Sequence, residues 1–368
     1  GLVGWEHRNF LGDLRRVSTD LRAGYAWVPT PWATTKRGTV ALLTGDFQQP
    51  AAFARWLDAS ARIELEKGLL EAYDFYAERL RLGLPLRLAP RWSIIPSWNL
   101  EVYQLSDYAL DFVPGATPTE AGPTLENCVG SVCLLSYLEQ RLAWDGRDDP
   151  VNTRRGFHVS LAVQEGFHVG AYGYQYLRVL PELRAFHPLG AHTVLAFRAR
   201  FGALVPLGET GDPPLVARFN AGGPISMRGY YTQRLGVMVR QRGEWVPVGG
   251  NGLADGSLEL RFGGTRTLGA VLFLDAGAVS NANSSPTEYQ TALDPTRLQY
   301  AAGVGLRYHT PFGPLRLDVA ARLPDNFHGD FDTWFPPVPY AYAEDGRLVL
   351  QPHREPIVAV HIALGEAF

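Results

Sequence analysis

Phe219-Asn-Ala-Gly-Gly-Pro-Ile-Ser-Met-Arg-Gly-Tyr-Tyr-Thr-Gln-Arg-Leu-Gly236 is a glycine-rich stretch in the second half of the chain. Its apolar residues follow neither the helical nor the strand period, so it is neither an amphipathic helix nor a half-buried strand. Gly222, Gly223 and Gly229 supply backbone freedom and Pro224 fixes a turn, as a compact folded loop requires. Taken alone, the stretch is equally typical of an ordinary glycine-rich surface loop. The residues on either side of it decide between the two interpretations.

Polar and apolar residues alternate on both sides of this stretch. In Ser257–Phe262, Ser, Glu and Arg alternate with Leu, Leu and Phe, which is the period of a strand with one wet face. The pattern predicts about fifteen strands, although Asp58–Glu66 also fits a helix. The strands are expected at Leu2–Asn9, Val17–Trp27, Thr39–Phe47, Leu57–Leu70, Ala72–Leu86, Trp92–Leu105, Leu134–Asp145, Phe157–Gln164, Tyr174–Ala185, Thr193–Phe201, Ser257–Phe262, Gly269–Val279, Leu298–His309, Leu315–Arg322 and Ile357–Phe368.

Short and long connections alternate between these strands. Long loops are expected at about 106–132, 202–256, 280–297 and 324–356, whereas Pro311–Pro314 is a tight turn. Arg, Asp and Glu occupy one face of strand after strand, which a soluble sandwich would not need. In a large barrel such side chains face a water-filled lumen, while the apolar row faces lipid. The sequence therefore predicts one all-β domain, residues 1–368, that forms an antiparallel transmembrane β-barrel with a long loop inserted into its lumen.

Composition narrows the class of protein further. The net charge of −3 gives no reason to expect nucleic acid as a partner. No apolar run of about 18 residues occurs, so no transmembrane helix is expected. The chain begins at Gly1 without a Met or a signal peptide, and we therefore expect a mature or partial chain.

Two cysteines, Cys128 and Cys133, lie in a loop rich in Pro and Gly. A zinc site is not expected, because no His or further Cys is nearby. We expect a local disulfide in an oxidising compartment, on the extracellular side of the barrel. Two free thiols are the alternative.

Several motifs resemble those of the BamA/TamA superfamily of outer-membrane assembly barrels. Phe219–Tyr230 is similar to that family's Gly-Gly…Val-Arg-Gly-Phe/Tyr loop, with Met227 where Val is usual. Phe273-Leu-Asp-Ala-Gly277 is similar to its Phe-x-Asp-x-Gly strand. Ser257–Phe262 resembles the family's Glu-bearing strand, and Pro311–Asp318 resembles its final hairpin. Leu364–Phe368 resembles its terminal strand with a C-terminal aromatic residue, and Asp149–Gly156 resembles a turn halfway round the barrel.

This resemblance covers the chain from about residue 134 to the end, and the earlier part is similar mainly in strand rhythm. It implies a sixteen-stranded barrel. Counting back from the C-terminus makes Leu2–Asn9 the second strand, so we expect the first strand to lie upstream of Gly1. The POTRA domains that family members carry before the barrel are not in this sequence. The chain is therefore expected to be the barrel portion of a longer protein.

The resemblance also implies that the loop is locked to the inner wall of the barrel. A cation on a loop inside the lumen needs carboxylates, and two of the family's wall positions are acidic and at lumen parity. The locking motif comprises Gly222, Gly223, Met227, Arg228, Gly229 and Tyr230, and its lumen partners are Glu259, Phe273, Asp275 and Gly277. Independent charges that contact lumen water are the alternative.

We expect no enzymatic activity, cofactor or metal. Gly-x-Ser-x-Gly, His-Glu-x-x-His and a phosphate-binding glycine loop after a strand do not occur in the sequence. His158, His309 and His361 lie at lumen parity on separate strands, where solvated wall histidines are more common than the Ser/His pair of a barrel hydrolase. Asp148-Asp149 could bind a cation, but a polar turn fixed by Pro150 explains the pair.

By resemblance, we expect the chain to insert or translocate other barrel proteins in the bacterial outer membrane, at a seam between its first and last strands. The last strand directs an apolar row toward lipid, and Gly365 weakens its final pairing because glycine adds backbone entropy and no packing. An incoming strand could then pair with this edge. Partners would be outer-membrane lipids, unfolded client proteins and accessory proteins of the periplasm or inner membrane. A secretion pore of the two-partner or patatin-fused kind and a passive channel are the alternatives. The seam residues are Val358, Val360, Ile362, Leu364, Gly365 and Phe368.

Overall fold

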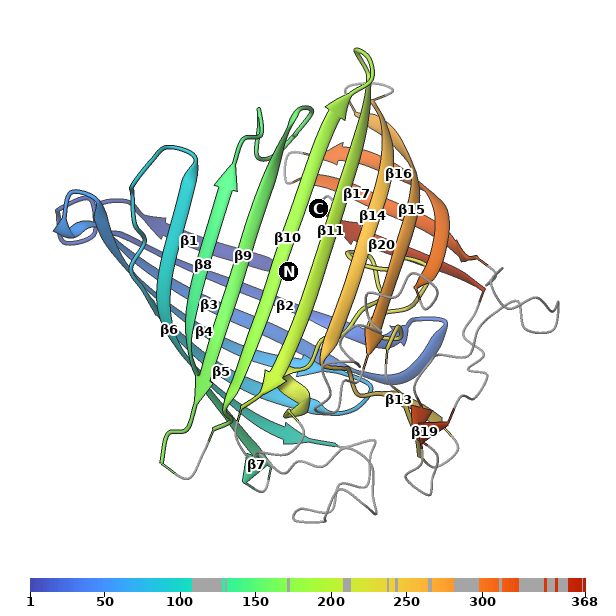
Figure 1. Ribbon diagram of the computed structural model, residues 1–368, viewed down its shortest axis with the longest axis horizontal. Coiled ribbons are helices and arrows are strands. Elements are labelled where there is room, and N and C mark those ends of the chain that lie inside the picture. The colour runs from blue at the N-terminus through green and yellow to red at the C-terminus, as the bar shows by residue number, and fades with distance from the viewer. Residues whose placement is uncertain are drawn as a thin grey trace. The chain divides into compact units, whose positions relative to one another are not determined.

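Strands make up most of the computed structural model, as the alternation of the sequence predicts (Figure 1). The model describes residues 1–107, 128–129, 131–170, 173–207, 213–236, 238–241, 244–263, 267–280, 298–310, 313–323, 341–342, 348–349, 357–365 and 367–368. No helix within these ranges is long and apolar enough to cross a membrane.

The main sheet follows the chain, strand beside strand, from β1 to β20. Its order begins at β1 and ends at β20, and the sheet is not closed. Its main path comprises β1 (Leu2–His7), β2 (Arg16–Thr30), β3 (Ala33–Ala54), β4 (Leu57–Leu69), β5 (Asp74–Gly83), β6 (Trp92–Ser106), β8 (Val132–Asp145), β9 (Gly156–Phe167), β10 (Tyr176–Pro188), β11 (Thr193–Pro206), β14 (Gly252–Gly263), β15 (Leu268–Ser280), β16 (Gln299–Thr310), β17 (Gly313–Arg322) and β20 (Val358–Leu364).

Short elements complete the described structure. β7 (Cys128–Val129) pairs with β8, and one turn of 3₁₀ helix spans Leu215–Ala217. A second, four-stranded sheet has the order β13-β12-β18-β19. Its strands are β12 (Met238–Gln241), β13 (Glu244–Pro247), β18 (Ala341–Tyr342) and β19 (Leu348–Val349).

The contacts divide the chain into two compact units. The first comprises residues 1–144, 161–179 and 204–217, and includes the ladder from β1 to β6 and β8. The second comprises residues 145–160, 180–203 and 218–368, and includes β14 to β17 and β20. The assignment of residues 1–368 to one barrel domain stays a prediction.

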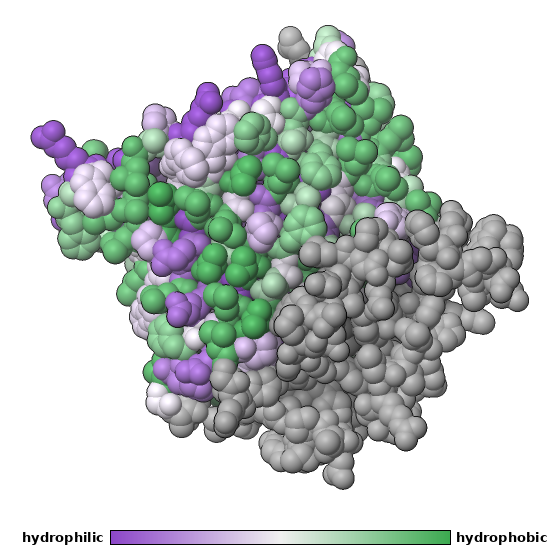
Figure 2. Space-filling view, viewed as in Figure 1, coloured by the Kyte–Doolittle hydropathy of each residue, from purple (hydrophilic) through white to green (hydrophobic). Residues whose placement is uncertain are grey.

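Strands β14 to β17 and β20 expose apolar residues on one face and bury the other face, where each strand has at least one polar or charged residue. On β16, Val304 and Leu306 are exposed whereas Arg307 is buried, and on β17, Leu317 is exposed whereas Asp318 is buried. Hydrophobic residues cover much of the strand surface that faces the viewer in Figure 2. This arrangement reverses the usual one of soluble proteins, in which charged residues are rarely buried. It is the pattern of strands between lipid and a polar interior.

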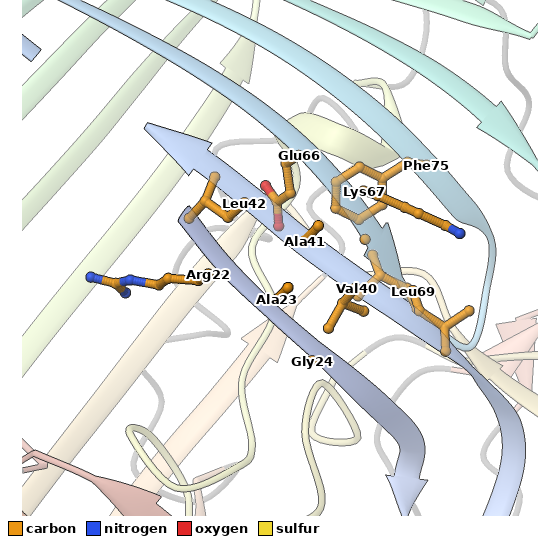
Figure 3. A pocket seen from close by; sticks show the side chains of 12 residues that line it. Arg22, Ala23, Gly24, Val40, Ala41, Leu42, Glu66, Lys67, Leu69 and Phe75 are labelled. Atoms are coloured by element: carbon orange, nitrogen blue, oxygen red, sulfur yellow. The ribbon is translucent and has the colours of Figure 1, made fainter. Parts of the chain in front are cut away.

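The inner face of β2 to β5 has a shallow cavity of about 390 Å³ (Figure 3). Figure 3 shows Arg22 and Lys67 pointing away from it on opposite sides, so Val40, Leu42 and Phe75 make its wall mainly apolar. The Phe75 ring covers Gly68, where an added Cβ would lie 2.1 Å from ring atom Cζ. None of the predicted site residues lines this cavity.

Two connections between predicted strands differ from the sequence predictions, the segments 28–38 and 202–256. The segment 28–38 is not a loop, because β2 continues to Thr30 and β3 begins at Ala33. Its threonines favour strands, and Pro29 lies at a register shift where a missing N–H is tolerated. Asp58–Glu66 belongs to β4, which agrees with the predicted strand Leu57–Leu70 and not with the helical alternative.

The predicted loop 202–256 is shorter than expected, since β11 ends at Pro206 and β14 begins at Gly252. Leu204 and Leu253 are buried and extend the alternation of these two strands beyond the predicted ends. The loops 106–132, 280–297 and 324–356 lie largely outside the described residues.

Candidate functional site

The glycine-rich stretch forms a folded loop, residues 219–236, which we term the lock loop. Gly222 and Gly223 have φ values of +100° and +97°, which side chains other than glycine rarely adopt. Within the loop, Gly223 N donates to Tyr230 O over 2.9 Å, and Leu235 N donates to Ala221 O over 3.1 Å. An added Cβ on Gly222 would lie 2.4 Å from Tyr231 O. The glycines therefore permit both the backbone path and the close approach that closes the loop.

β14 and β15 provide the wall against which this loop packs. These strands are antiparallel neighbours (Figure 1). Their register places Ser257 opposite Asp275 and Glu259 opposite Phe273. Residues two apart in a strand share a face, so the four side chains lie together on the inner face. All four are buried.

Arg228 of the lock loop binds this wall through its whole guanidinium group. Its Nη1 lies 2.5 Å from Glu259 Oε1, its Nε 2.9 Å from Asp275 Oδ2, and its Nη2 2.7 Å from Asp275 Oδ1. Nη2 also donates to Ser257 Oγ over 2.8 Å, and the backbone N of Arg228 donates to Asp275 Oδ2 over 3.0 Å. The predicted proximity of Arg228 to Glu259 and Asp275 is confirmed.

The charges in this cluster balance. Burial by itself lowers the pKa of Arg228, but the hydrogen bond and charge of Asp275, together with Glu259, raise it above its ordinary value. Arg261 Nε binds the other oxygen of Glu259 at 2.8 Å, so two cations face two carboxylates. The Arg228 Cζ atom also lies 3.5 Å from the centre of the Phe273 ring, a distance that favours a cation–π contact.

Residues on either side of Arg228 fit the wall closely. An added Cβ on Gly277 would lie 2.9 Å from Met227 Cγ, and one on Gly229 would lie 2.4 Å from Ala301 Cβ. Both positions need glycine because of this close packing. Tyr230 OH donates to Gln299 Oε1 over 3.0 Å, with Arg322 Cζ 5.2 Å from its ring centre. The motif therefore contacts β14, β15, β16 and β17.

The last strand of the sheet touches the lock loop from its inner face. His361 Nε2 donates to Arg228 O over 2.9 Å, and its ring lies edge-on to Tyr231 at 6.5 Å. Val358 and Ile362 point away from this face and are exposed, and Val360 is half-buried. β20 thus presents its polar row to the loop and its apolar row outward.

Comparison with known proteins identifies the family. A family model described as the Omp85 superfamily domain matches residues 42–333. The chain belongs to the Omp85 superfamily. A similar solved structure is BamA from Haemophilus ducreyi lacking POTRA domains 1-3, which is 16% identical with a TM-score of 0.67. The match covers 87% of this chain and 63% of that chain, so the chain spans less than two thirds of its length. No curated protein matches.

The C-terminal residues of this Omp85 chain leave the terminal strand, contrary to the prediction that Leu364–Phe368 is all strand. β20 ends at Leu364, and Gly365 turns the chain with a φ of +93°. Ala367 is buried, and Phe368 packs 6.2 Å from Phe186, measured between ring centres. Glycine tolerates this conformation as readily as an extended one, which is why the alternation did not reveal the turn.

Two wall arginines hold this C-terminal turn. Arg261 and Arg198 lie 4.8 and 5.3 Å from the Phe368 ring centre. Arg198 Nη1 also donates to Ile225 O of the lock loop over 2.8 Å and to Ala367 O over 3.3 Å, while its Nη2 pairs with Asp255 at 3.2 Å. One arginine therefore joins the wall, the lock loop and the C-terminal turn.

Sequence reasoning missed these bridging residues as a group. Ser257, Gln299, Arg198 and Arg261 are polar residues at inner parity, and that parity is the one signal that could have found them. Within the described residues, no group of three or more His, Cys, Asp or Glu could hold a metal ion.

The predicted cysteine pair is also present. Cys133 is disulfide-bonded, and the register of β7 and β8 places Cys128 opposite it. The chain has two cysteines and neither is free, so the predicted disulfide is confirmed. The placement of this pair on the extracellular side of the barrel stays a prediction.

Proposed function

We propose that the chain is an outer-membrane barrel that inserts or translocates other barrel proteins at the edge of β20. Membership of the Omp85 superfamily and the BamA-like fold support this class of function. The observation that carries the proposal is the lock loop, which contacts the inner face of the sheet's last strand while that strand exposes its apolar residues outward.

The edge of β20 has properties that suit an exchange of strands. β20 is seven residues long and pairs with the ten-residue β17, and no other partner of β20 is found among the described strands. Gly365 ends the pairing, as its N donates to Pro314 O at the last point of the ladder. An unpaired strand edge offers backbone amides and carbonyls to an incoming strand. Folding of the client supplies the free energy, so no nucleotide, metal or catalytic residue is required.

Site-specific photo-crosslinking tests where a client binds. A photoreactive amino acid would replace Ile362 of β20, and a matched variant would carry it at Val304 of β16, which is also apolar, exposed and outward-facing. The two variants are reconstituted in liposomes, and a urea-unfolded outer-membrane barrel protein is added. We expect crosslinks at position 362 and few at 304. Equal crosslinking at both positions, or none at 362, contradicts the proposal.

A disulfide engineered between β20 and the strand that closes the barrel beside it separates insertion from passive conduction. In an assembly or translocation protein it should stop insertion of the client, and reduction should restore it. A passive channel would keep its conductance in a planar bilayer when locked. Insertion that continues with the disulfide closed would rule out the lateral route. Outer-membrane lipids and unfolded client proteins are the partners that this proposal requires, and accessory proteins of the periplasm or inner membrane are further partners in it.

A further inference from the structure

A cavity of about 540 Å³ lies beside the lock, on the same inner face of the second unit. It is lined by the turn 151–154, the start of β11, the ends of β14 and β16 and the start of β15. Arg154, Arg261, Arg307, His192 and His309 all line it. None of its described lining residues is acidic, so the cavity is a basic one.

Glycines keep this space open. Gly263 lies opposite Gly269 in the β14–β15 ladder, and Gly269 lies opposite Arg307 in the next ladder. No side chain from either glycine fills the space in front of the strands. An added Cβ on Gly269 would lie 3.7 Å from His309 Nε2, at the cavity wall. The small residues therefore leave a hollow between the arginines.

Positive charge exceeds negative charge around the cavity. Arg228 and Arg261 share Glu259, while Arg307 binds Asp318 at 2.6 Å and Arg316 lies 3.5 Å from the same carboxylate. Asp148 lies beside Arg154, whose backbone N donates to its Oδ1, but none of these carboxylates lines the cavity, whereas Arg154, Arg261 and Arg307 do. Charges that are partly shielded from water interact strongly, so a bound anion would be stabilised here.

The turn presents Arg154 in an ordered position. Asp148 Oδ1 accepts hydrogen bonds from the backbone N atoms of Asp149, Arg154 and Arg155 at 3.0 to 3.1 Å. Arg154 Nη2 donates to Gly190 O over 2.9 Å. Its other guanidinium N–H groups, and the rings of His192 and His309, have no hydrogen-bond partner among the described residues. Hydrogen-bond donors of Arg154, His192 and His309 are thus held at the cavity without a partner among the described residues.

We propose that this cavity binds a phosphate group, either as free phosphate or as the headgroup of a phospholipid. The planar fork of a guanidinium group matches two phosphate oxygens at once. Phosphate offers more oxygens than a carboxylate does to the three arginines that line the cavity. The cavity volume of about 540 Å³ leaves room beside the phosphate for the rest of a headgroup.

Titration of the full chain with inorganic phosphate, in detergent free of phospholipid, tests the site. Arg154→Gln removes one charged donor and should raise the Kd for phosphate about tenfold. Arg155→Gln is the matched control, because Arg155 is the next residue of the same turn, is exposed and does not line the cavity. We expect its Kd to stay within about twofold of the wild-type value. Unchanged thermal unfolding would show that both variants are folded.

A soluble lipid distinguishes the two sources of phosphate. Dihexanoylphosphatidylglycerol, kept below its micelle concentration, is titrated alone and in competition with inorganic phosphate. Tighter, competitive binding of the lipid assigns the site to a headgroup, and binding of inorganic phosphate alone assigns it to the free anion. Absence of saturable binding by either probe, or equal weakening by Arg154→Gln and Arg155→Gln, overturns the proposal. If Arg154→Gln does not fold, His192→Gln replaces it with the same expectation. The result is independent of client insertion, so it does not stand or fall with the proposed function.

Discussion

Replacement of Arg228 by methionine removes the cation of the lock and keeps most of its aliphatic volume. Asp275 then loses the hydrogen bonds from Nε and Nη2, at 2.9 and 2.7 Å, and keeps those from Ser257 Oγ and from the backbone N of residue 228. Glu259 keeps its bond to Arg261. One cation then faces two buried carboxylates, which leaves one negative charge unpaired. Breaking a buried ion pair in this way costs about 3–5 kcal/mol.

This loss of free energy weakens the docking of the lock loop onto the wall. The wall strands themselves stay paired, because the backbone hydrogen bonds of the sheet hold them. Since about 1.4 kcal/mol changes an equilibrium tenfold, the fraction of molecules with an undocked loop should rise by roughly two to four powers of ten. Hydrogen–deuterium exchange of a peptide covering residues 219–236 measures this directly. The backbone N–H groups of Gly223, Ser226, Tyr230 and Leu235 are hydrogen-bonded within the loop and should exchange faster.

Two further variants make the measurement decisive. In Arg228→Met/Asp275→Asn the excess charge is gone, so the double variant should be less destabilised than the sum of the two single variants, by about 1 kcal/mol or more. Arg62→Met is the control, because Arg62 pairs with Asp46 at 2.7 Å but is half exposed, and exposed pairs contribute about 1 kcal/mol or less. The reasoning is refuted if exchange of the lock loop in Arg228→Met stays within about threefold of wild type.

Two more predictions concern the disulfide and the turn that carries Arg154. Cys128 and Cys133 should resist maleimide labelling in denaturant until they are reduced. In the chain-entropy model, the double variant Cys128→Ser/Cys133→Ser should lower the stability of the local hairpin by about 2 kcal/mol, which is measured as faster amide exchange. Labelling without reduction would contradict the prediction. Burial raises the pKa of Asp148, but the backbone N–H groups of Arg155, Arg154 and Asp149 outweigh it and lower the pKa below its ordinary value. Protection of these N–H groups against hydrogen exchange should therefore be complete above the unfolded pKa of Asp148, about 3.9, and be lost as pH falls through its folded pKa. The Asp148→Asn variant should show no such pH dependence. Protection that is independent of pH in the wild-type chain would contradict the prediction.

The inner wall of the lock was predictable because strand alternation fixes which side chains share a face. Glu259 and Asp275 lie at inner parity on neighbouring strands, and a register that pairs Glu259 with Phe273 brings both carboxylates to one cation. The identity of that cation followed from its place in the glycine-rich stretch. Parity alone left independent lumen charges as the alternative, and the resemblance to the assembly-barrel family favoured the lock.

The contacts between distant segments were not predictable in the same way. Arg198 binds Ile225 and Ala367, which are 27 and 169 residues away in the chain, and no spacing rule connects them. The turn at Gly365 depends on a backbone conformation that glycine accepts but does not require. The extension of β2 and β3 through 28–38 depends on pairing across the ladder, which overrides the loop propensity of Pro29 and Pro31.

The lock loop and the last strand are held by the same residues, and this makes their positions interdependent. The side chain of Arg228 binds residues of β14 and β15, and its carbonyl oxygen accepts a hydrogen bond from His361 of β20. Arg198 likewise binds the lock loop at Ile225 and the C-terminal turn at Ala367. A loop that leaves the wall must therefore break its contacts with β20 and with the residues that follow it. Groups that share a partner show coupled free energies, so undocking of the loop and loosening of the terminal strand should favour each other. Changes to the buried charges of the lock should therefore reach β20 through His361 and the C-terminal turn through Arg198.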